Sequence, residues 1–106
     1  MQNNVVNAPV TTHSATSTGL NIYAYKFGRI AFVSILSGTT SAALSANGIF
    51  YTLPDAFKPI NTVEMVDTYG SAHVRVRILT SGAIDTTTAI ASGTYIRCSG
   101  CYITAS

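Results

Sequence analysis

The sequence predicts an all-β protein, folded as one antiparallel β-sandwich. No stretch repeats its apolar residues with the period of a helix. Short apolar or alternating runs follow one another instead, and Gly, Ser and Asn turn residues separate them. The chain also holds 15 threonines, whose branched side chains suit strands. At 106 residues it is long enough for one domain with a core of marginal size.

The first nineteen residues are predicted to be a tether. They are polar, contain Pro9 and end in Gly19, a composition typical of chain ends and linkers. We therefore expect residues 1–19 to be a tether or the end of a stalk. Residues 20–106 are expected to form the β-sandwich head domain.

Short strands are expected throughout the head domain. The strand at residues 29–36 is apolar on both faces, which predicts burial on two sides. The strand at residues 84–90 is rich in threonine and is expected at a sheet edge. Small residues at 37–48 indicate a connection, and Gly82 indicates a hairpin turn. The expected strands cover residues 20–25, 29–36, 49–53, 60–68, 72–79, 84–90 and 95–104.

The sequence LPDAFKP, residues 53–59, predicts a stiff connection. Proline fixes φ and removes a backbone donor, so neither Pro54 nor Pro59 suits a central strand. We therefore expect an extended, rigid crossover that carries the chain from one sheet to the other. Leu53 and Phe57 are expected to plug the end of the sandwich.

Charge is scarce along the chain. Only 9% of residues are charged and the formal net charge is +2, whereas a typical domain is about 25% charged. The Lys and Arg residues form no run, so no nucleic-acid partner is expected. Either the many hydroxyl residues solvate the surface, or other subunits cover much of it. The two-faced apolar strand at 29–36 favours the second interpretation.

No targeting or membrane segment is expected. Residues 1–18 lack both the basic and the apolar region of a secretory signal. No apolar run reaches the length of about 18 residues that a membrane helix needs. We therefore expect no membrane insertion.

The acidic residues do not predict catalysis. Glu64 and Asp67 are three positions apart in an expected strand, so their carboxylates leave on opposite faces. The chain contains neither a phosphate-binding glycine loop nor a nucleophile elbow. We expect no enzyme activity, no cofactor and no metal.

Cys98 and Cys101 have the C-x-x-C spacing of redox and zinc motifs. A redox pair normally opens a helix, whereas these residues lie in the expected last strand around Gly100. A zinc site would need two further ligands, and His13 and His73 are the only histidines. Three interpretations stay open: free structural thiols, which we favour, a local disulfide at a bulge, or a metal or redox role.

The sequence AHVRVRIL, residues 72–79, carries a row of polar side chains. The strand alternates, so its histidine and two arginines are expected on the face opposite its apolar residues. Such a row is either a solvated face or a site where guanidinium groups bind hydroxyls or phosphates. A tyrosine at the preceding turn adds a surface for a sugar ring, and a nearby aspartate an acceptor. The predicted ligand-binding residues are Asp67, Tyr69, His73, Arg75 and Arg77.

The order of several motifs resembles the C-terminal head domains of phage tail-fibre and baseplate receptor-binding proteins. The resemblance covers about residues 23–104. LPDAFKP, followed by ILTSGAI, is its most specific part, and YKFGRIAFVSI and SGTYIRCSGCYIT flank these motifs.

The resemblance implies a homotrimeric, jelly-roll-like head that binds saccharide on a host bacterial surface without metal or catalysis. The partners it implies are a cell-surface glycan or teichoic-acid-like polymer and an upstream fibre or baseplate protein. The protein would then be assembled in the host cytoplasm, released by lysis and located at the virion tail tip. The alternatives are a structural fibre cap or trimerisation domain without ligand, and a small enzyme or lectin outside any virus.

Overall fold

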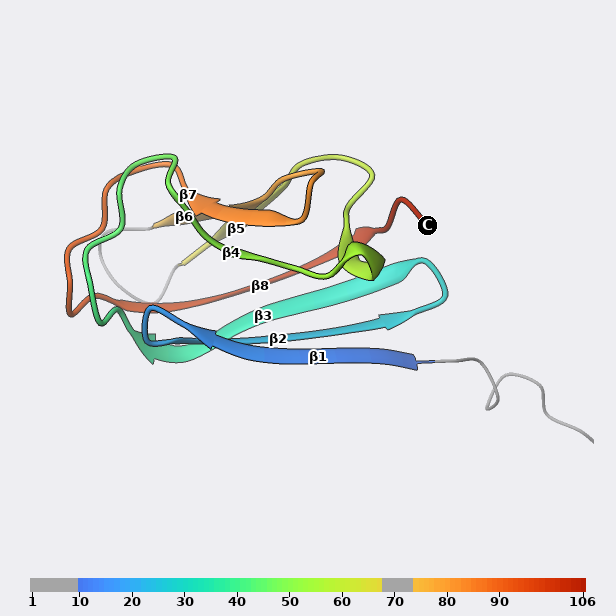
Figure 1. Ribbon diagram of the computed structural model, residues 1–106, viewed down its shortest axis with the longest axis horizontal. Helices are drawn as coiled ribbons and strands as arrows, with labels where there is room; N and C mark the ends of the chain where they lie inside the picture. The colour runs from blue at the N-terminus through green and yellow to red at the C-terminus, as the bar shows by residue number, and fades with distance from the viewer. Residues whose placement is uncertain (1–9, 68–73) are drawn as a thin grey trace, which may run out of the picture.

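The computed structural model describes residues 10–67 and 74–106, apart from the side chains of residues 36–38. Within these residues the protein is all-β, as predicted, with two antiparallel four-stranded sheets (Figure 1). The strands are β1 Val10–Ser17, β2 Leu20–Phe27, β3 Ile30–Thr39, β4 Ile49–Thr52, β5 Val63–Val66, β6 Arg75–Ile78, β7 Ala83–Thr86 and β8 Tyr95–Ile103.

The first sheet has the order β1-β2-β3-β8, and the second has the order β4-β7-β6-β5. Figure 1 shows one sheet lying over the other. The chain changes sheet between β3 and β4 and returns between β7 and β8. Because β8 pairs with β3, residues from both ends of the chain contribute to the first sheet.

Strand β1 corrects the expected tether, because residues 10–17 pair with β2 along their whole length. The polar residues of β1 are mainly threonine and serine, and threonine suits an edge strand as well as a linker. The turn that follows needs backbone at positive φ, with Thr18 at 51° and Gly19 at 80°, the pattern of a tight hairpin turn. Residues 1–9 lie outside the described residues.

One apolar core lies between the two sheets. Strands β2, β3, β5, β6 and β8 supply alternate residues to it, as the period of two requires. The first sheet contributes Leu20 together with β-branched and small residues and Tyr102, and the second sheet contributes Met65 and its neighbours. The largest fully buried side chains are Phe57, Leu20, Ile22, Ile35, Met65, Ile78, Ile84, Ile96, Val33, Val76, Thr86 and Thr104.

The outer face of the first sheet is apolar and uncovered in the single chain. Strand β3 buries Ala31, Val33 and Ile35, but Ile30 is 43% and Phe32 38% exposed. The two-sided burial expected for residues 29–36 is therefore absent from one chain. We call the set of exposed large residues on this side the apolar face: Val10, Tyr23, Tyr25, Phe27, Ile30, Phe32 and Ile103.

The proline segment joins β4 to β5, which are the two edge strands of the second sheet. The expectation of a crossover between sheets was therefore wrong: the segment spans one end of the same sheet. Its centre is the 3-10 helix η2, Asp55–Phe57, rather than an extended bridge. Leu53 and Phe57 are buried, as predicted. Tyr102 of β8 donates a hydrogen bond to the Phe57 carbonyl over 2.7 Å, which ties the segment to the first sheet.

Strand β7 lies in the centre of the second sheet, between β4 and β6, and its four residues are buried. The edge position expected for residues 84–90 was therefore wrong. Threonine content suggested an exposed strand, but Thr86 faces the core and donates to the Thr88 carbonyl over 2.9 Å. Residues after β7 pair instead with the connection after β3, through a bridge between Leu44 and Ile90.

Candidate ligand-binding site

Strand β6 places two arginines on the outer face of the second sheet, the side turned away from the first sheet. Val74, Val76 and Ile78 are buried. Arg75 is exposed and Arg77 is half-buried. The alternation predicted for these five residues is therefore confirmed.

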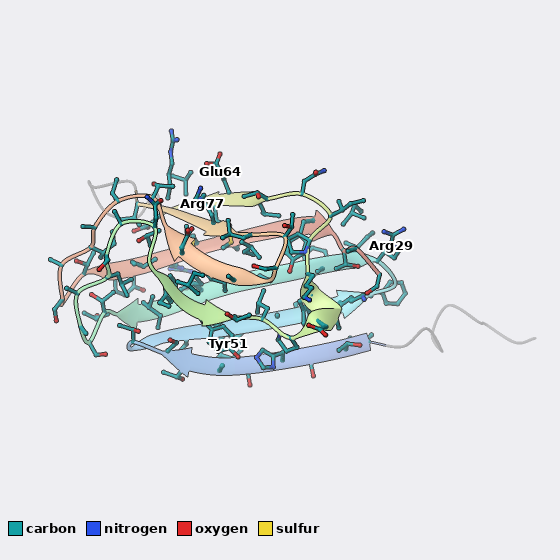
Figure 2. All side chains as sticks on the ribbon, turned by 45° about the horizontal axis from the view of Figure 1, so that its top comes forward. Arg29, Tyr51, Glu64 and Arg77 are labelled. Carbon is teal, nitrogen blue, oxygen red and sulfur yellow. The ribbon has the colours of Figure 1, made fainter. Side chains whose placement is uncertain are left out.

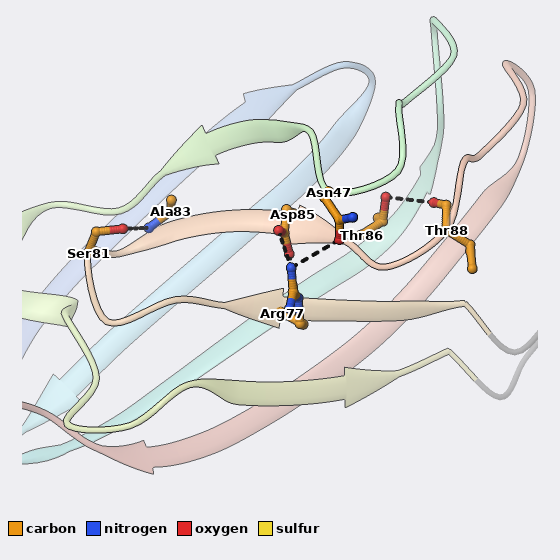
Figure 3. A network of polar contacts seen from close by, with 7 residues as sticks. All are labelled: Asn47, Arg77, Ser81, Ala83, Asp85, Thr86 and Thr88. Carbon is orange, nitrogen blue, oxygen red and sulfur yellow. Dashed lines mark hydrogen bonds and ion pairs between the residues drawn. The ribbon is translucent and has the colours of Figure 1, made fainter.

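Arg77 is held by groups of its own chain. Its Nε donates to Oδ1 of Asp85 over 2.9 Å, and its Nη2 donates to Oδ2 over 2.6 Å. The same Nη2 donates to Oδ1 of Asn47 over 3.3 Å. Figure 3 shows these contacts joining β6, β7 and the connection that precedes β4. The Asp85 side chain is only 2% exposed, so Arg77 neutralises a buried carboxylate rather than facing solvent freely.

The charges around Arg77 strengthen this pair. The hydrogen bond with Asp85 raises the pKa of Arg77 above its ordinary value, and the nearby charges of Asp85 and Glu64 add to the effect, against partial desolvation. Glu64 of β5 stands opposite Arg77 in the sheet register. Both side chains point to the side of the second sheet away from β1 (Figure 2). Arg77 is therefore a structural clamp with little capacity left for a bidentate ligand.

Arg75 is the arginine that remains open to a ligand. Its side chain is exposed, and it stands opposite Val66 of β5. Its backbone carbonyl accepts from the amide of Thr87 over 3.2 Å. Within residues 10–67 and 74–106, no hydrogen bond or ion pair holds the Arg75 guanidinium. This group can therefore bind a phosphate or several hydroxyls without breaking an internal contact.

The other predicted residues do not all join Arg75. Asp67 is 2% exposed and continues the inward-facing positions of β5, after Met65. It therefore leaves on the side opposite Arg75, and the structure does not bring it into the row. The opposite directions expected for Glu64 and Asp67 are confirmed by their exposure. Tyr69 and His73 lie outside the described residues.

The two cysteines leave β8 on opposite sides. Both thiols are free, with Cys98 buried and Cys101 exposed. Burial raises the pKa of Cys98 to about 12, and the charge of Asp67 adds to this shift. The local disulfide is therefore absent, and Cys98 is a poor nucleophile because the thiolate is the reactive form. No group of three or more possible metal ligands gathers within the described residues.

A polar contact that the sequence did not indicate closes one edge of the protein. Nε2 of His13 in β1 is hydrogen-bonded to the hydroxyl of Tyr51 in β4, and the two rings stack with centroids 5.9 Å apart. This pair links the edge strands of the two sheets. The residues lie 38 positions apart, so only the tertiary fold could reveal it. A shallow hollow of about 450 Å³ lies nearby, lined by Thr12, His13, Ser14, Tyr23, Ala24 and Tyr25.

Comparisons with known proteins do not assign this chain to a family. No family model matches it, and no curated protein sequence matches it. Among the residues that the structure describes, no helix has the length and apolar character needed to cross a bilayer.

Proposed function

We propose that this protein is an attachment module: a jelly-roll-like, homotrimeric head that binds saccharide on a bacterial host. It would stand at the tip of a phage tail fibre or baseplate, joined to an upstream fibre or baseplate protein. The ligand is a cell-surface glycan or a teichoic-acid-like polymer. Assembly would take place in the host cytoplasm, with release by lysis. The sequence resemblance supports this proposal.

The observation that carries the proposal is the unlike character of the two outer faces. The first sheet turns seven large apolar residues outward, between 38% and 55% exposed, whereas the second turns out Glu64 and Arg75 beside two exposed apolar residues, Ile49 and Val66. A protein with one mainly apolar and one more polar outer face is suited to assemble through the first and to bind through the second. The two outer faces lie on opposite sides of the same core, so assembly and ligand binding would use different surfaces.

Arg75 is the central residue of the proposed ligand site. Its free guanidinium suits the phosphates of a wall polymer, because charge-assisted contacts are strong and directional. His73 and Tyr69 remain proposed members of the site. Arg77 serves by keeping β6 and β7 in place, and Asp67 is not retained as a ligand contact.

A cell-binding assay tests the site. Labelled wild-type protein is compared with Arg75→Ala and His73→Ala, and with Lys58→Ala as a charge-matched control, since Lys58 is a 41% exposed cation next to η2, outside both outer faces. We expect the first two variants to bind at least several-fold more weakly, and the control to bind as the wild type does. Oligomeric state is measured on the same samples, so that loss of assembly is separated from loss of contact.

The choice between ligand and structural roles follows from the same assay. Intact binding in both Arg75→Ala and His73→Ala would remove the site assignment. Wild-type protein that binds neither cells nor purified wall polymer would favour the second candidate, a fibre cap or trimerisation domain without ligand. The apolar face favours this second candidate, because an exposed apolar surface calls for a partner subunit and does not by itself call for a saccharide ligand.

A further inference from the structure

The apolar face forms a continuous surface rather than scattered exposure. In the sheet register, Val10, Phe27, Ile30 and Ile103 stand side by side and form one row across all four strands. The next row of the same face contains Thr12, Tyr25, Phe32 and Cys101. Tyr25 and Phe32 stack with ring centroids 5.1 Å apart, so the aromatic surface is already ordered in the single chain.

The area of this surface lies at the upper end of what a free monomer usually shows. A fully buried aromatic side chain covers about 150–250 Å², so the exposed parts of the seven residues amount to roughly 600 Å². The largest apolar patch of a typical monomer is about 300–600 Å². A stable interface buries about 800 Å² per partner. The apolar face alone therefore supplies most of one subunit's share.

The chemistry of the face suits a second copy of the chain. Its two apolar rows contain no charged side chain, so two identical faces can meet without like-charge repulsion. The row beyond them is Ser14, Tyr23, Ser34 and Ser99, whose hydroxyls resemble the polar rim of a subunit interface. The exposed arginine of this side, Arg97 of β8, lies beyond these three rows.

We infer that copies of this chain assemble by packing their apolar faces, the outer faces of β1-β2-β3-β8, against one another about the symmetry axis. The inference rests on the proposed homotrimer and adds the surface through which it forms. It does not depend on the saccharide ligand. The second sheet then faces outward, away from the contact.

The native cysteines provide the test. Cys101 lies on the second apolar row and is exposed in the single chain, whereas Cys98 is buried in the core. The assembled wild-type protein is treated with a small alkylating reagent, and labelling at each cysteine is followed by peptide mass spectrometry. Mass is determined by light scattering on the same samples. We expect an oligomer in which Cys101 is alkylated at least about ten-fold more slowly than in a dissociated variant.

Matched variants distinguish the apolar face from the outer face of the second sheet as the site of subunit contact. Ile103→Asp, together with Phe32→Asp, introduces charge into the apolar face and is expected to give a monomer with rapid labelling of Cys101. Val66→Asp is the control, because Val66 is 45% and Ile103 47% exposed, but Val66 lies on the second sheet. Slow labelling of Cys98 in each variant shows that the core remains folded.

Each outcome has a distinct meaning. An oligomer that stays assembled in Ile103→Asp and Phe32→Asp, or that labels Cys101 quickly, overturns the surface and leaves the proposed trimer standing. If the wild-type protein is a monomer, both the proposed contact surface and the proposed trimer are overturned. Binding of that monomer to lipid vesicles would then identify a membrane as the partner of the apolar face. Loss or retention of cell binding bears only on the ligand site, since that assay uses Arg75 on the opposite sheet.

Discussion

Phe57→Ala is expected to destabilise the protein more than any substitution in an exposed part of the same connection. Phe57 is 1% exposed, and it closes the end of the core at η2. Its ring lies near that of His13, with centroids 6.3 Å apart. Removing the ring loses about 2 kcal/mol of transfer free energy and leaves a cavity that costs about 24 cal/mol per Å³ where it does not collapse. Together these terms amount to about 3–5 kcal/mol.

This loss is large against the total stability of a small domain, which is about 5–15 kcal/mol. Because 1 kcal/mol shifts the Tm of a domain of this size by about 4–8 °C, we expect the Tm to fall by more than about 10 °C. Urea unfolding followed by circular dichroism measures the free energy directly, at one fixed protein concentration because assembly raises apparent stability.

The control is Ile60→Ala, three positions along the same connection. Ile60 is 54% exposed, so its truncation is expected to change the free energy of unfolding by less than about 0.5 kcal/mol. A loss for Phe57→Ala below about 1 kcal/mol, or one equal to that of the control, would refute the role of Phe57 as the plug of the core.

Three further predictions concern turns, alkaline pH and the thiols. Gly19→Ala should lower the Tm more than Gly28→Ala, because both have positive φ but only a Cβ at Gly19 would clash, 2.3 Å from a backbone oxygen. The free energy of unfolding should be unaffected by these groups below pH 9.0 and should fall as the pH rises toward 12. Burial raises the pKa of Cys98 and of Tyr102 to about 12, so these groups lose their protons at lower pH in the unfolded chain than in the folded one. The urea midpoint across this range should fall less in Tyr102→Phe than in the wild type. Replacing Cys98 and Cys101 together by serine should leave assembly and cell binding near wild type, whereas metal-dependent loss of binding or a redox activity would contradict a structural role.

The site was only partly predictable because its residues depend on register. The alternation of β6 is local, so the sequence sufficed to direct Arg75 and Arg77 away from the core. Whether each guanidinium is free depends on the neighbouring strand. A signal for the clamp was present: a hairpin around Gly82 pairs Ile78 with Ile84 and brings Arg77 opposite Asp85. The contact from Asn47 had no such local signal, since it lies 30 positions from Arg77.

Sequence alone determined the features that arise from neighbouring residues. The period of two identified which side of β6 is buried, and Gly82 marked a turn, because alternation and φ are properties of a few consecutive residues. The absence of a helical period and the short strand-like runs between turn residues determined the all-β class in the same way. The sequence also placed Phe57 in the core, because an aromatic side chain in a stiff proline segment is expected to bury itself against the end of the sandwich.

Tertiary structure decided how the strands combine. The pairing of β3 with β8 joins residues from 56 positions apart (Thr39 and Tyr95) to 73 positions apart (Ile30 and Ile103), and no local pattern specifies such a contact. That pairing brings Ile103 beside Ile30 and completes the apolar face. The central place of β7 and the return of the proline segment to its own sheet have the same origin. Strand order and register depend on the free energy of the whole core, in which each strand occupies the position that buries its apolar side against all the others.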